Sequence, residues 1–390
     1  MYRMRYLLAL LCLGCWGHLV GQTKTEFVAQ GQAHAQRRDY GPAIEAYTAA
    51  LRLDSLYTDA YLLRGQAALA LGGVEQAFYD FTRAIITDSS RADGYYFRGD
   101  VYQRYGRLIQ ALQDFDRAIA LQPDSGTYYI ARAIVHYEER RLLQAQSDLN
   151  KALVLLPNSP KAALYMGYVQ ILQGDSKAAE HYLNRCLKSD PANADAFIQL
   201  AEIRRAEGKL SEALDFYGKA IAVVPQAHIA YSARGELYLA LTEYDKAVQD
   251  LDSAIRHFPF STEYYNLRAT ALLYLKQYDR CLEDCETSLK LTPTAEGYIN
   301  RGNVRYNQKL YLEALHDVDL ALKLDNQSGA AYLLRGLCRL KLELSSAACA
   351  DFEKAIDLGM PQANALLRKY CPEAAAARAQ AAQEKATSDQ

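Results

Sequence analysis

Long runs of basic residues are missing from this 390-residue sequence, which carries 44 Lys and Arg residues, 46 Asp and Glu residues and a formal net charge of −2. Nucleic-acid binding needs a clustered positive surface that displaces counterions from the phosphates. Because the basic residues are scattered along the chain, we expect no nucleic-acid partner.

The motifs of common enzymes are missing as well. The sequence has no glycine-rich phosphate loop, no nucleophile elbow and no zinc-protease helix motif. Its seven His residues are scattered, and none lies at a short metal-ligand spacing from another. Cys281 and Cys285 lie four residues apart without a nearby His, which favours core thiols over a metal pair. We therefore expect a protein that is not an enzyme and that uses no metal and no small-molecule cofactor.

Long apolar runs are absent beyond the N-terminus, where an apolar stretch over residues 6–20 follows Arg3 and Arg5 and precedes Gly21. This order is typical of a secretory signal peptide, and the stretch is too short for a confident membrane span. We predict a signal peptide over residues 1–21 and a secreted or periplasmic protein of bacterial type. Two alternatives stay open: an uncleaved membrane anchor that faces the periplasm, and a lipoprotein modified at Cys15.

What the sequence does contain is a repeat of 34 residues. Each repeat has two small residues seven positions apart, and a third small residue lies twelve positions before them. The first member of the pair is Cys281 in the eighth repeat and alanine in the other nine: Ala43, Ala77, Ala111, Ala145, Ala179, Ala213, Ala247, Ala314 and Ala348. Small residues let two helix backbones approach closely, so these positions predict where helices cross.

Residues 92–125 display one complete repeat. Helical spacing puts its aromatic and small residues on one face, a glycine interrupts that helix, a second apolar stripe follows, and a proline ends the repeat. This order resembles the tetratricopeptide repeat family, and the matching residues are Tyr95, Gly99, Tyr102, Gly106, Ala111, Phe115, Ala118 and Pro123.

The resemblance implies an all-α fold, a right-handed superhelical solenoid of antiparallel helical hairpins. A solenoid needs a cap on its last repeat, and we assign that role to a helix over residues 363–371. Residues 372–390 have no aromatic and no large aliphatic residue, which predicts a disordered or weakly helical tail. The ten predicted repeats within residues 24–362 are 24–57, 58–91, 92–125, 126–159, 160–193, 194–227, 228–261, 262–294, 295–328 and 329–362.

The resemblance also implies a function, because in this family the first helices of the hairpins line an inner groove that holds an extended peptide or a partner helix. We predict a non-catalytic protein-interaction scaffold with a protein or peptide partner. The alternatives are a structural component of a membrane-associated envelope complex, and capture of a ligand or glycan. The carboxylate clamp of chaperone-binding members is not expected, because Ile299 fills the lysine slot beside Asn303 and the next repeat offers Leu334.

Family geometry places three residues of each first helix in the groove, one, two and five positions after the opening aromatic. In the third to sixth repeats many of these are aromatic or aliphatic, and exposed apolar patches tend to mark binding sites. Ile130, Leu164 and Ile198 occupy the same positions of the repeat. The alternative for these three is that they pack in the core and do not face the groove. The candidate partner-binding residues are Tyr96, Phe97, Asp100, Arg104, Tyr137, Tyr165, Tyr168, Glu202 and Arg205.

Charged residues follow the repeat too. In seven repeats the seventh residue is Arg and the residue sixteen positions later is Asp, as in Arg98 and Asp114, and the other three repeats lack both. This joint presence and absence predicts an ion pair between the two helices of one hairpin. The alternative is an inherited pattern without contact.

Six cysteines follow the predicted signal peptide. Export would place them in an oxidising compartment, where a disulfide can form. One interpretation is that all six are reduced core thiols. The best candidate for a bridge is Cys349 with Cys371, which would tie the last repeat to the cap helix.

Overall fold

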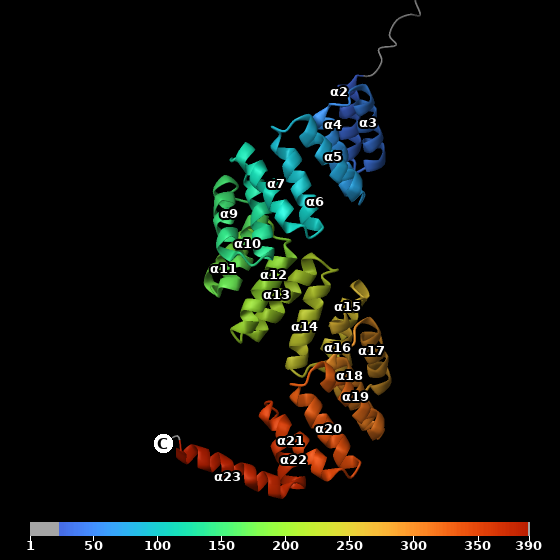
Figure 1. The fold of residues 1–390 in the computed structure, drawn as a ribbon, viewed down its shortest axis with the longest axis vertical. Helices are drawn as coiled ribbons and strands as arrows, with labels where there is room; N and C mark the ends of the chain where they lie inside the picture. Colours follow the sequence, from blue (N-terminus) through green and yellow to red (C-terminus); the bar gives the residue numbers. More distant parts are fainter. Residues whose placement is uncertain (1–22, 389–390) are drawn as a thin grey trace, which may run out of the picture. The chain divides into compact units, whose positions relative to one another are not determined.

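The computed structural model describes residues 23–388, with side chains to residue 380, and this part of the chain is helical throughout, without strands (Figure 1). The predicted signal peptide lies outside the described residues. None of the described helices is both long and apolar enough to cross a membrane.

Ten antiparallel hairpins follow one another: α2–α3 (Lys24–Gln36, Tyr40–Leu53), α4–α5 (Thr58–Ala70, Val74–Thr87), α6–α7 (Ala92–Arg104, Leu108–Leu121), α8–α9 (Gly126–Glu138, Leu142–Leu155), α10–α11 (Pro160–Gln173, Ser176–Ser189), α12–α13 (Ala194–Ala206, Leu210–Val223), α14–α15 (His228–Ala240, Tyr244–His257), α16–α17 (Thr262–Tyr274, Tyr278–Leu291), α18–α19 (Ala295–Asn307, Tyr311–Leu324) and α20–α21 (Gly329–Lys341, Ser345–Asp357).

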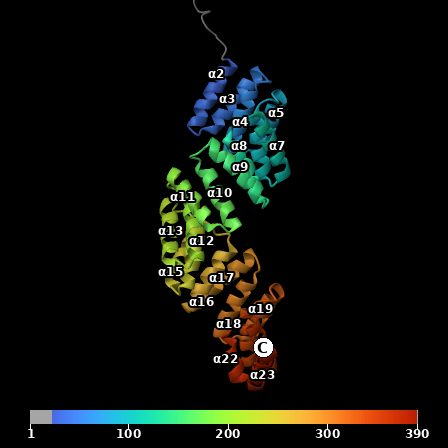
Figure 2. The same cartoon turned by 90° about the vertical axis from the view of Figure 1, so that its left-hand side faces the viewer.

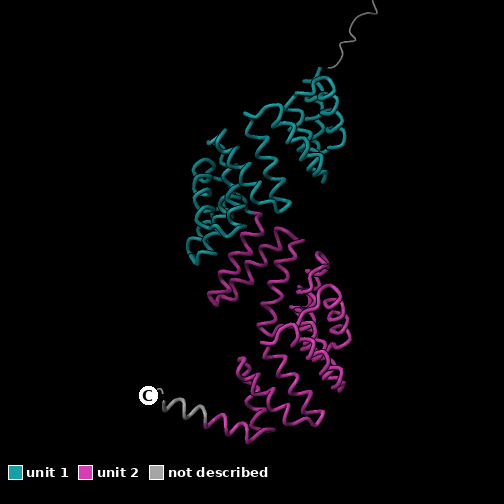
Figure 3. Tube along the Cα trace, in the orientation of Figure 1, with its two compact units in different colours: residues 1–191 teal, residues 192–390 magenta. Residues whose placement is uncertain are grey.

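The hairpins belong to two compact units, residues 1–191 and residues 192–390 (Figure 3). Within each unit the hairpins stack in chain order, which is clear in both views (Figures 1 and 2). The first helices of successive hairpins contact one another, as in the series α2, α4, α6, α8 and α10 of the first unit. They therefore form one layer, and the second helices form the other.

The small residues of the repeat lie where the two helices of a hairpin cross. A Cβ atom added to Gly99 would lie 2.7 Å from Phe115, and one added to Gly65 would lie 2.5 Å from Phe81. Ala111, Phe115 and Ala118 are fully buried on the second helix. The prediction that small residues mark close helix crossings is therefore confirmed in these hairpins.

All seven predicted Arg–Asp ion pairs are present. In the α6–α7 hairpin, Arg98 donates from Nε and from Nη2 to the two carboxylate oxygens of Asp114, both at 2.8 Å. Each aspartate is buried, with at most 6% of its surface exposed. The alternative of a sequence pattern without contact is excluded. The pairs are Arg64–Asp80, Arg98–Asp114, Arg132–Asp148, Arg234–Asp250, Arg268–Asp284, Arg301–Asp317 and Arg335–Asp351.

Four of these arginines also reach the preceding hairpin, which the sequence did not predict. The third guanidinium nitrogen, Nη1, donates to a residue sixteen positions before the arginine, on the second helix of that hairpin. Arg132 reaches Asp116 at 2.7 Å, for example. The other three contacts are Arg64 to Thr48 at 3.0 Å, Arg268 to Asp252 at 2.5 Å and Arg335 to Asp319 at 3.2 Å.

After the tenth hairpin, the short helix α22 (Ala363–Tyr370) packs against α21. A disulfide joins Cys349 of α21 to Cys371 at the end of α22, with a Cα–Cα distance of 5.8 Å. The candidate bridge is thus present. The other four described cysteines are buried and lie outside this bridge, as expected of core thiols: Cys186, Cys281, Cys285 and Cys338.

The tail is helical, which was one of the two alternatives predicted for it. Residues Pro372–Ser388 form the helix α23 rather than a disordered segment. Ala, Glu, Gln, Lys and Arg are strong helix formers, and they make up most of this stretch. The absence of aromatic and large aliphatic residues excludes a core, but it does not exclude a helix.

Candidate functional site

In the first unit, a cavity of about 480 Å³ opens on the face formed by the first helices. Leu62, Leu63 and Gln66 of α4 occupy the slots that hold Tyr96, Phe97 and Asp100 one repeat later. Of the predicted site residues, Phe97 lines this cavity. The complete lining is Val28, Gln32, Tyr57, Asp59, Leu62, Leu63, Gln66, Arg91, Asp93 and Phe97.

One rim of this cavity is an ion triad. Arg91 donates from Nη1 to Asp59 at 2.9 Å and from Nη2 to Asp93 at 3.3 Å. Burial opposes the charge of Arg91, but the two carboxylates outweigh it and raise the pKa of the guanidinium. Tyr128 also donates its hydroxyl proton to Asp93, at 2.7 Å. The cavity therefore combines an apolar floor with fixed polar groups, as ligand sites commonly do.

Tyr96 is held among other rings. Its ring centroid lies 5.1 Å from that of Phe97, 6.1 Å from that of Phe115 and 5.0 Å from that of Tyr128. Burial raises the pKa of its hydroxyl. Tyr96 is therefore partly used in packing, which leaves only the rest of its surface for a partner.

Three of the predicted tyrosines come together further along the same face. Tyr137 of α8 meets Tyr165 and Tyr168 of α10, with ring centroids 5.8 and 5.9 Å away, and the latter two are 5.4 Å apart. All three are half-buried. We call these three residues the tyrosine cluster.

The aliphatic residues of the same slots lie in the core. Ile130 is 5% exposed, and Leu164 and Ile198 are each 7% exposed. Core packing, the alternative considered for them, is therefore their role. Asp100 and Arg104 form an ion pair at 2.8 Å along α6, in which the Arg104 side chain is 62% exposed.

Glu202 and Arg205 belong to the second unit, where they form a separate charged group. Arg205 contacts Glu202 at 2.8 Å and Glu236 of the next hairpin at 2.7 Å. The buried Tyr217 donates its hydroxyl proton to Glu202, and burial together with this carboxylate raises the pKa of that hydroxyl. These side chains are already engaged with one another.

The carboxylate clamp that was not expected would have used Asn300 and Asn303, which lie in the second unit. Asn300 is buried and donates to the backbone oxygen of Asn266 at 3.2 Å and to the hydroxyl of Thr270 at 3.1 Å. Its amide hydrogens are therefore used inside the protein, which is a physical reason not to expect a carboxylate there.

Sequence reasoning missed the N-terminal part of the cavity. It placed the candidate residues in the third to sixth repeats, whereas Val28, Gln32, Leu62, Leu63 and Gln66 come from the first two. The repeat could have identified them, because these residues lie one or two periods before Tyr96, Phe97 and Asp100 and occupy the same positions of the repeat. Within residues 23–388, no group of three or more His, Cys, Asp and Glu side chains could hold a metal ion.

Family models decide the assignment. Two models described as "Tetratricopeptide repeat" match the chain, one over residues 28–95 and 232–296 and the other over residues 92–125. A model of the "Tetratricopeptide repeat protein 21 second ARM domain" matches residues 120–208. The chain is a tetratricopeptide repeat protein. No curated protein matches the sequence of this tetratricopeptide repeat protein.

Solved structures with a similar chain path include yeast Tom70, at 18% identity and a TM-score of 0.44, covering 93% of this chain and 90% of that one. Pseudomonas aeruginosa pilF matches at 21% identity and a TM-score of 0.48, over 54% of this chain and 96% of that one. YrrB, described as a TPR protein with an unusual peptide-binding site, matches at 24% identity and 0.40, over 49% and 98%. At these values the likeness carries no inference about the partner of this chain.

Proposed function

We propose that this tetratricopeptide repeat protein is a non-catalytic scaffold that holds a peptide or helix of a protein partner on the first-helix face of its first unit. The observation that carries the proposal is the cavity of about 480 Å³, because it lies among the slots that form the binding groove in this family. The tyrosine cluster supports it, since tyrosine supplies much of the energy at protein interfaces.

The chemistry of the face indicates the kind of partner. Leu63 and Phe97 offer apolar surface to a buried side chain, and the exposed amides of Gln32 and Gln66 can pair with a peptide backbone. The pair of Asp100 and Arg104 lies on the next helix and would fix the direction of a charged segment. The partner is therefore an apolar segment with charged flanks.

Secretion to the periplasm or the outside of the cell is part of the same proposal. The disulfide between Cys349 and Cys371 supports it, because disulfides persist in oxidising compartments and are rare in the cytosol. N-terminal sequencing of the mature protein tests it: cleavage after Gly21 is expected, and a chain that begins at Met1 contradicts it. Lipid attached to Cys15 would favour the envelope-complex alternative.

The binding face can be tested by photo-crosslinking in cells. A benzophenone amino acid replaces Gln66 in the cavity, or Tyr79 of α5 as a control, since the Tyr79 side chain is 53% exposed and lies outside the cavity. One defined partner peptide should crosslink from position 66 and not from position 79. The double substitution Tyr165→Ala and Tyr168→Ala should weaken this crosslink while the melting temperature stays within a few degrees of the parent value.

A matched variant keeps the test specific. Tyr79→Ala combined with Tyr274→Ala removes two tyrosines that are 53% and 61% exposed and lie outside the cavity and the tyrosine cluster. This variant should crosslink as the parent does. Equal crosslinking in the variant without Tyr165 and Tyr168 would show that the tyrosine cluster does not contribute to binding. Crosslinking from position 79 alone would show that the partner binds outside the cavity.

A further inference from the structure

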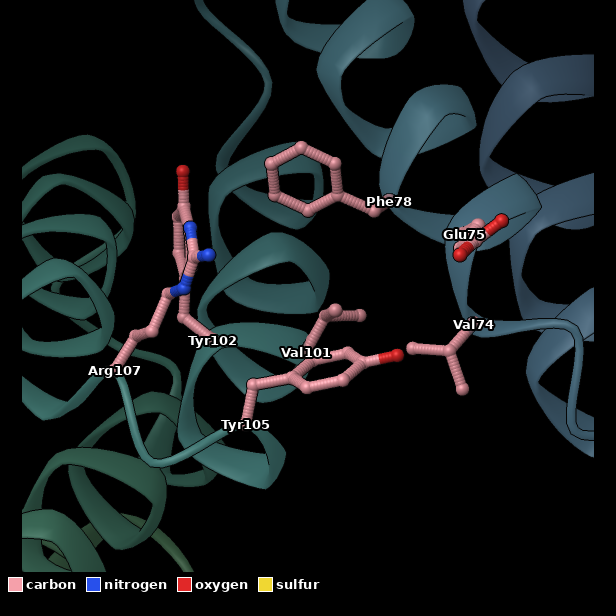
Figure 4. Close-up of a pocket in the computed structure, with 7 residues that line it drawn as sticks. All are labelled: Val74, Glu75, Phe78, Val101, Tyr102, Tyr105 and Arg107. Atoms are coloured by element: carbon pink, nitrogen blue, oxygen red, sulfur yellow. The ribbon is translucent and has the colours of Figure 1, made fainter.

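A second cavity, of about 320 Å³, lies at the turn edge of the first unit, outside the groove slots. One wall is the start of α5, with Val74 and Phe78, and the other is the end of α6 and the turn after it, with Tyr102 and Tyr105 (Figure 4). Phe78 and Tyr102 meet edge to face, with ring centroids 5.3 Å apart. Val101, which is 1% exposed, forms the floor.

Val74 is small for its position, which leaves space in the cavity. Seven of the other nine hairpins begin their second helix with a larger residue. A leucine at this position packs against the first helix of the following hairpin, as Leu108 does in the cluster that contains Val135. Val74 faces Val101, the equivalent of Val135, and leaves space that a longer side chain would fill. The seven larger residues are Tyr40, Leu108, Leu142, Leu210, Tyr244, Tyr278 and Tyr311.

Two opposite charges flank the opening. Figure 4 shows Glu75 on the α5 side and Arg107 on the far side, alongside Tyr102. Both residues are exposed, and among the described residues neither side chain takes part in an ion pair or a hydrogen bond. Tyr105, whose side chain is 60% exposed, reaches toward Val74 between them.

We propose that this cavity binds one aromatic side chain of an extended partner peptide, which carries an acidic residue toward Arg107 and a basic residue toward Glu75. The volume is at the lower end of ligand sites, about 300–1,000 Å³, so it suits a single large side chain. Aromatic anchors in pockets commonly dominate binding energy at interfaces. In an extended peptide, residues two positions apart point to the same side, so the charges belong two residues before and after the anchor.

This anchor pocket is separate from the groove. An experiment can therefore refute the pocket without refuting partner binding in the groove, and the reverse. The probe is a fluorescein-labelled peptide with the order Glu-Gly-Trp-Gly-Lys and blocked ends, and the readout is fluorescence anisotropy against the full chain at low salt. Saturable binding is expected, and replacing the tryptophan with glycine should abolish it. Tyr165→Ala with Tyr168→Ala should leave this binding unchanged.

Two variants close or open the cavity without removing a fully buried side chain. Val74→Tyr fills it, and tyrosine already occupies the same position in four other hairpins. Tyr105→Ala removes a wall that is largely exposed. Each should weaken binding by roughly tenfold or more, whereas Tyr79→Ala, an exposed tyrosine of the same α5, should have no effect.

Charge exchange tests the flanking contacts. A peptide with Glu at both flanks should bind the parent protein several-fold more weakly, and the variant Glu75→Lys should restore it while weakening the original peptide. Binding that survives Val74→Tyr refutes the pocket, and a Glu75→Lys variant that does not distinguish the two peptides refutes the charged flanks. No saturable binding of the original peptide refutes both.

Discussion

Asp114→Ala should destabilise the α6–α7 hairpin strongly. The substitution leaves Arg98 without its bidentate partner, and removing one partner of a buried ion pair costs about 3–5 kcal/mol. The Arg98 side chain is 20% exposed and that of Asp114 is 8% exposed. Water can therefore hydrate part of the orphaned guanidinium, and we expect the lower end, about 3 kcal/mol.

The chain itself supplies the matched control. Leu200 and Phe216 occupy the positions of Arg98 and Asp114 in the α12–α13 hairpin. Apolar replacement of a whole buried ion pair is often neutral. The double variant Arg98→Leu with Asp114→Phe should therefore lie within about 1 kcal/mol of the parent. Asp100→Ala, which breaks the exposed pair with Arg104, should also cost about 1 kcal/mol or less.

Hydrogen exchange is the suitable assay, because a chain of two compact units does not unfold in one two-state step. Amides of α6 and α7 should exchange roughly 150-fold faster in Asp114→Ala, since 1.4 kcal/mol corresponds to a factor of ten. They should change by less than about tenfold in the two controls. Unchanged protection in Asp114→Ala, or a double variant as labile as the single one, would refute the reasoning.

Three further predictions concern the hairpins and the cap. Replacing Cys349 and Cys371 with serine should lower stability at the C-terminal end by about 3 kcal/mol, since the bridge closes a loop with a sequence separation of 22; six reactive thiols in the unfolded, non-reduced protein would contradict it. Gly99→Ala should cost about 1–3 kcal/mol, measured by hydrogen exchange of the α6 and α7 amides, because its Cβ would lie 2.7 Å from Phe115. Burial lowers the pKa of His136 in the folded protein, so the unfolded chain binds the proton more tightly. The free energy of unfolding should therefore be constant above pH 6.5, about the ordinary pKa of histidine, and should decrease as the pH falls below it. His136→Tyr, which copies Tyr102, should remove this loss between pH 7.5 and 5.5 in denaturant titrations.

The repeat made most of the fold predictable. A hairpin with small residues at fixed positions has few ways to pack, so Gly99 and Ala111 already indicate a helix crossing. The ion pairs were predictable for a different reason: Arg and Asp appear and disappear together, and Met166 with Tyr182 shows the same rule in reverse. Two positions of a repeat that change together indicate that their side chains are in contact, and this can be read from the sequence alone.

The site was less predictable, because slot rules say which way a residue faces but not how neighbouring rings fill space. Tyr96 was predicted to face a partner, yet its ring packs against Tyr128 of α8, the first helix of the next hairpin. The anchor pocket includes Val74, at a position where seven other hairpins have leucine or tyrosine. No periodic pattern in the sequence singles out that difference.

The third nitrogen of the arginines has a consequence for cooperativity. Among the described hairpins, its contacts with a preceding hairpin occur in the second, fourth, eighth and tenth, from Arg64, Arg132, Arg268 and Arg335. The stability of a repeat array is a sum of repeat terms and nearest-neighbour interface terms. Because these interface terms alternate, hairpins should open in couples: α2–α5 and α6–α9 in the first unit, α14–α17 and α18–α21 in the second.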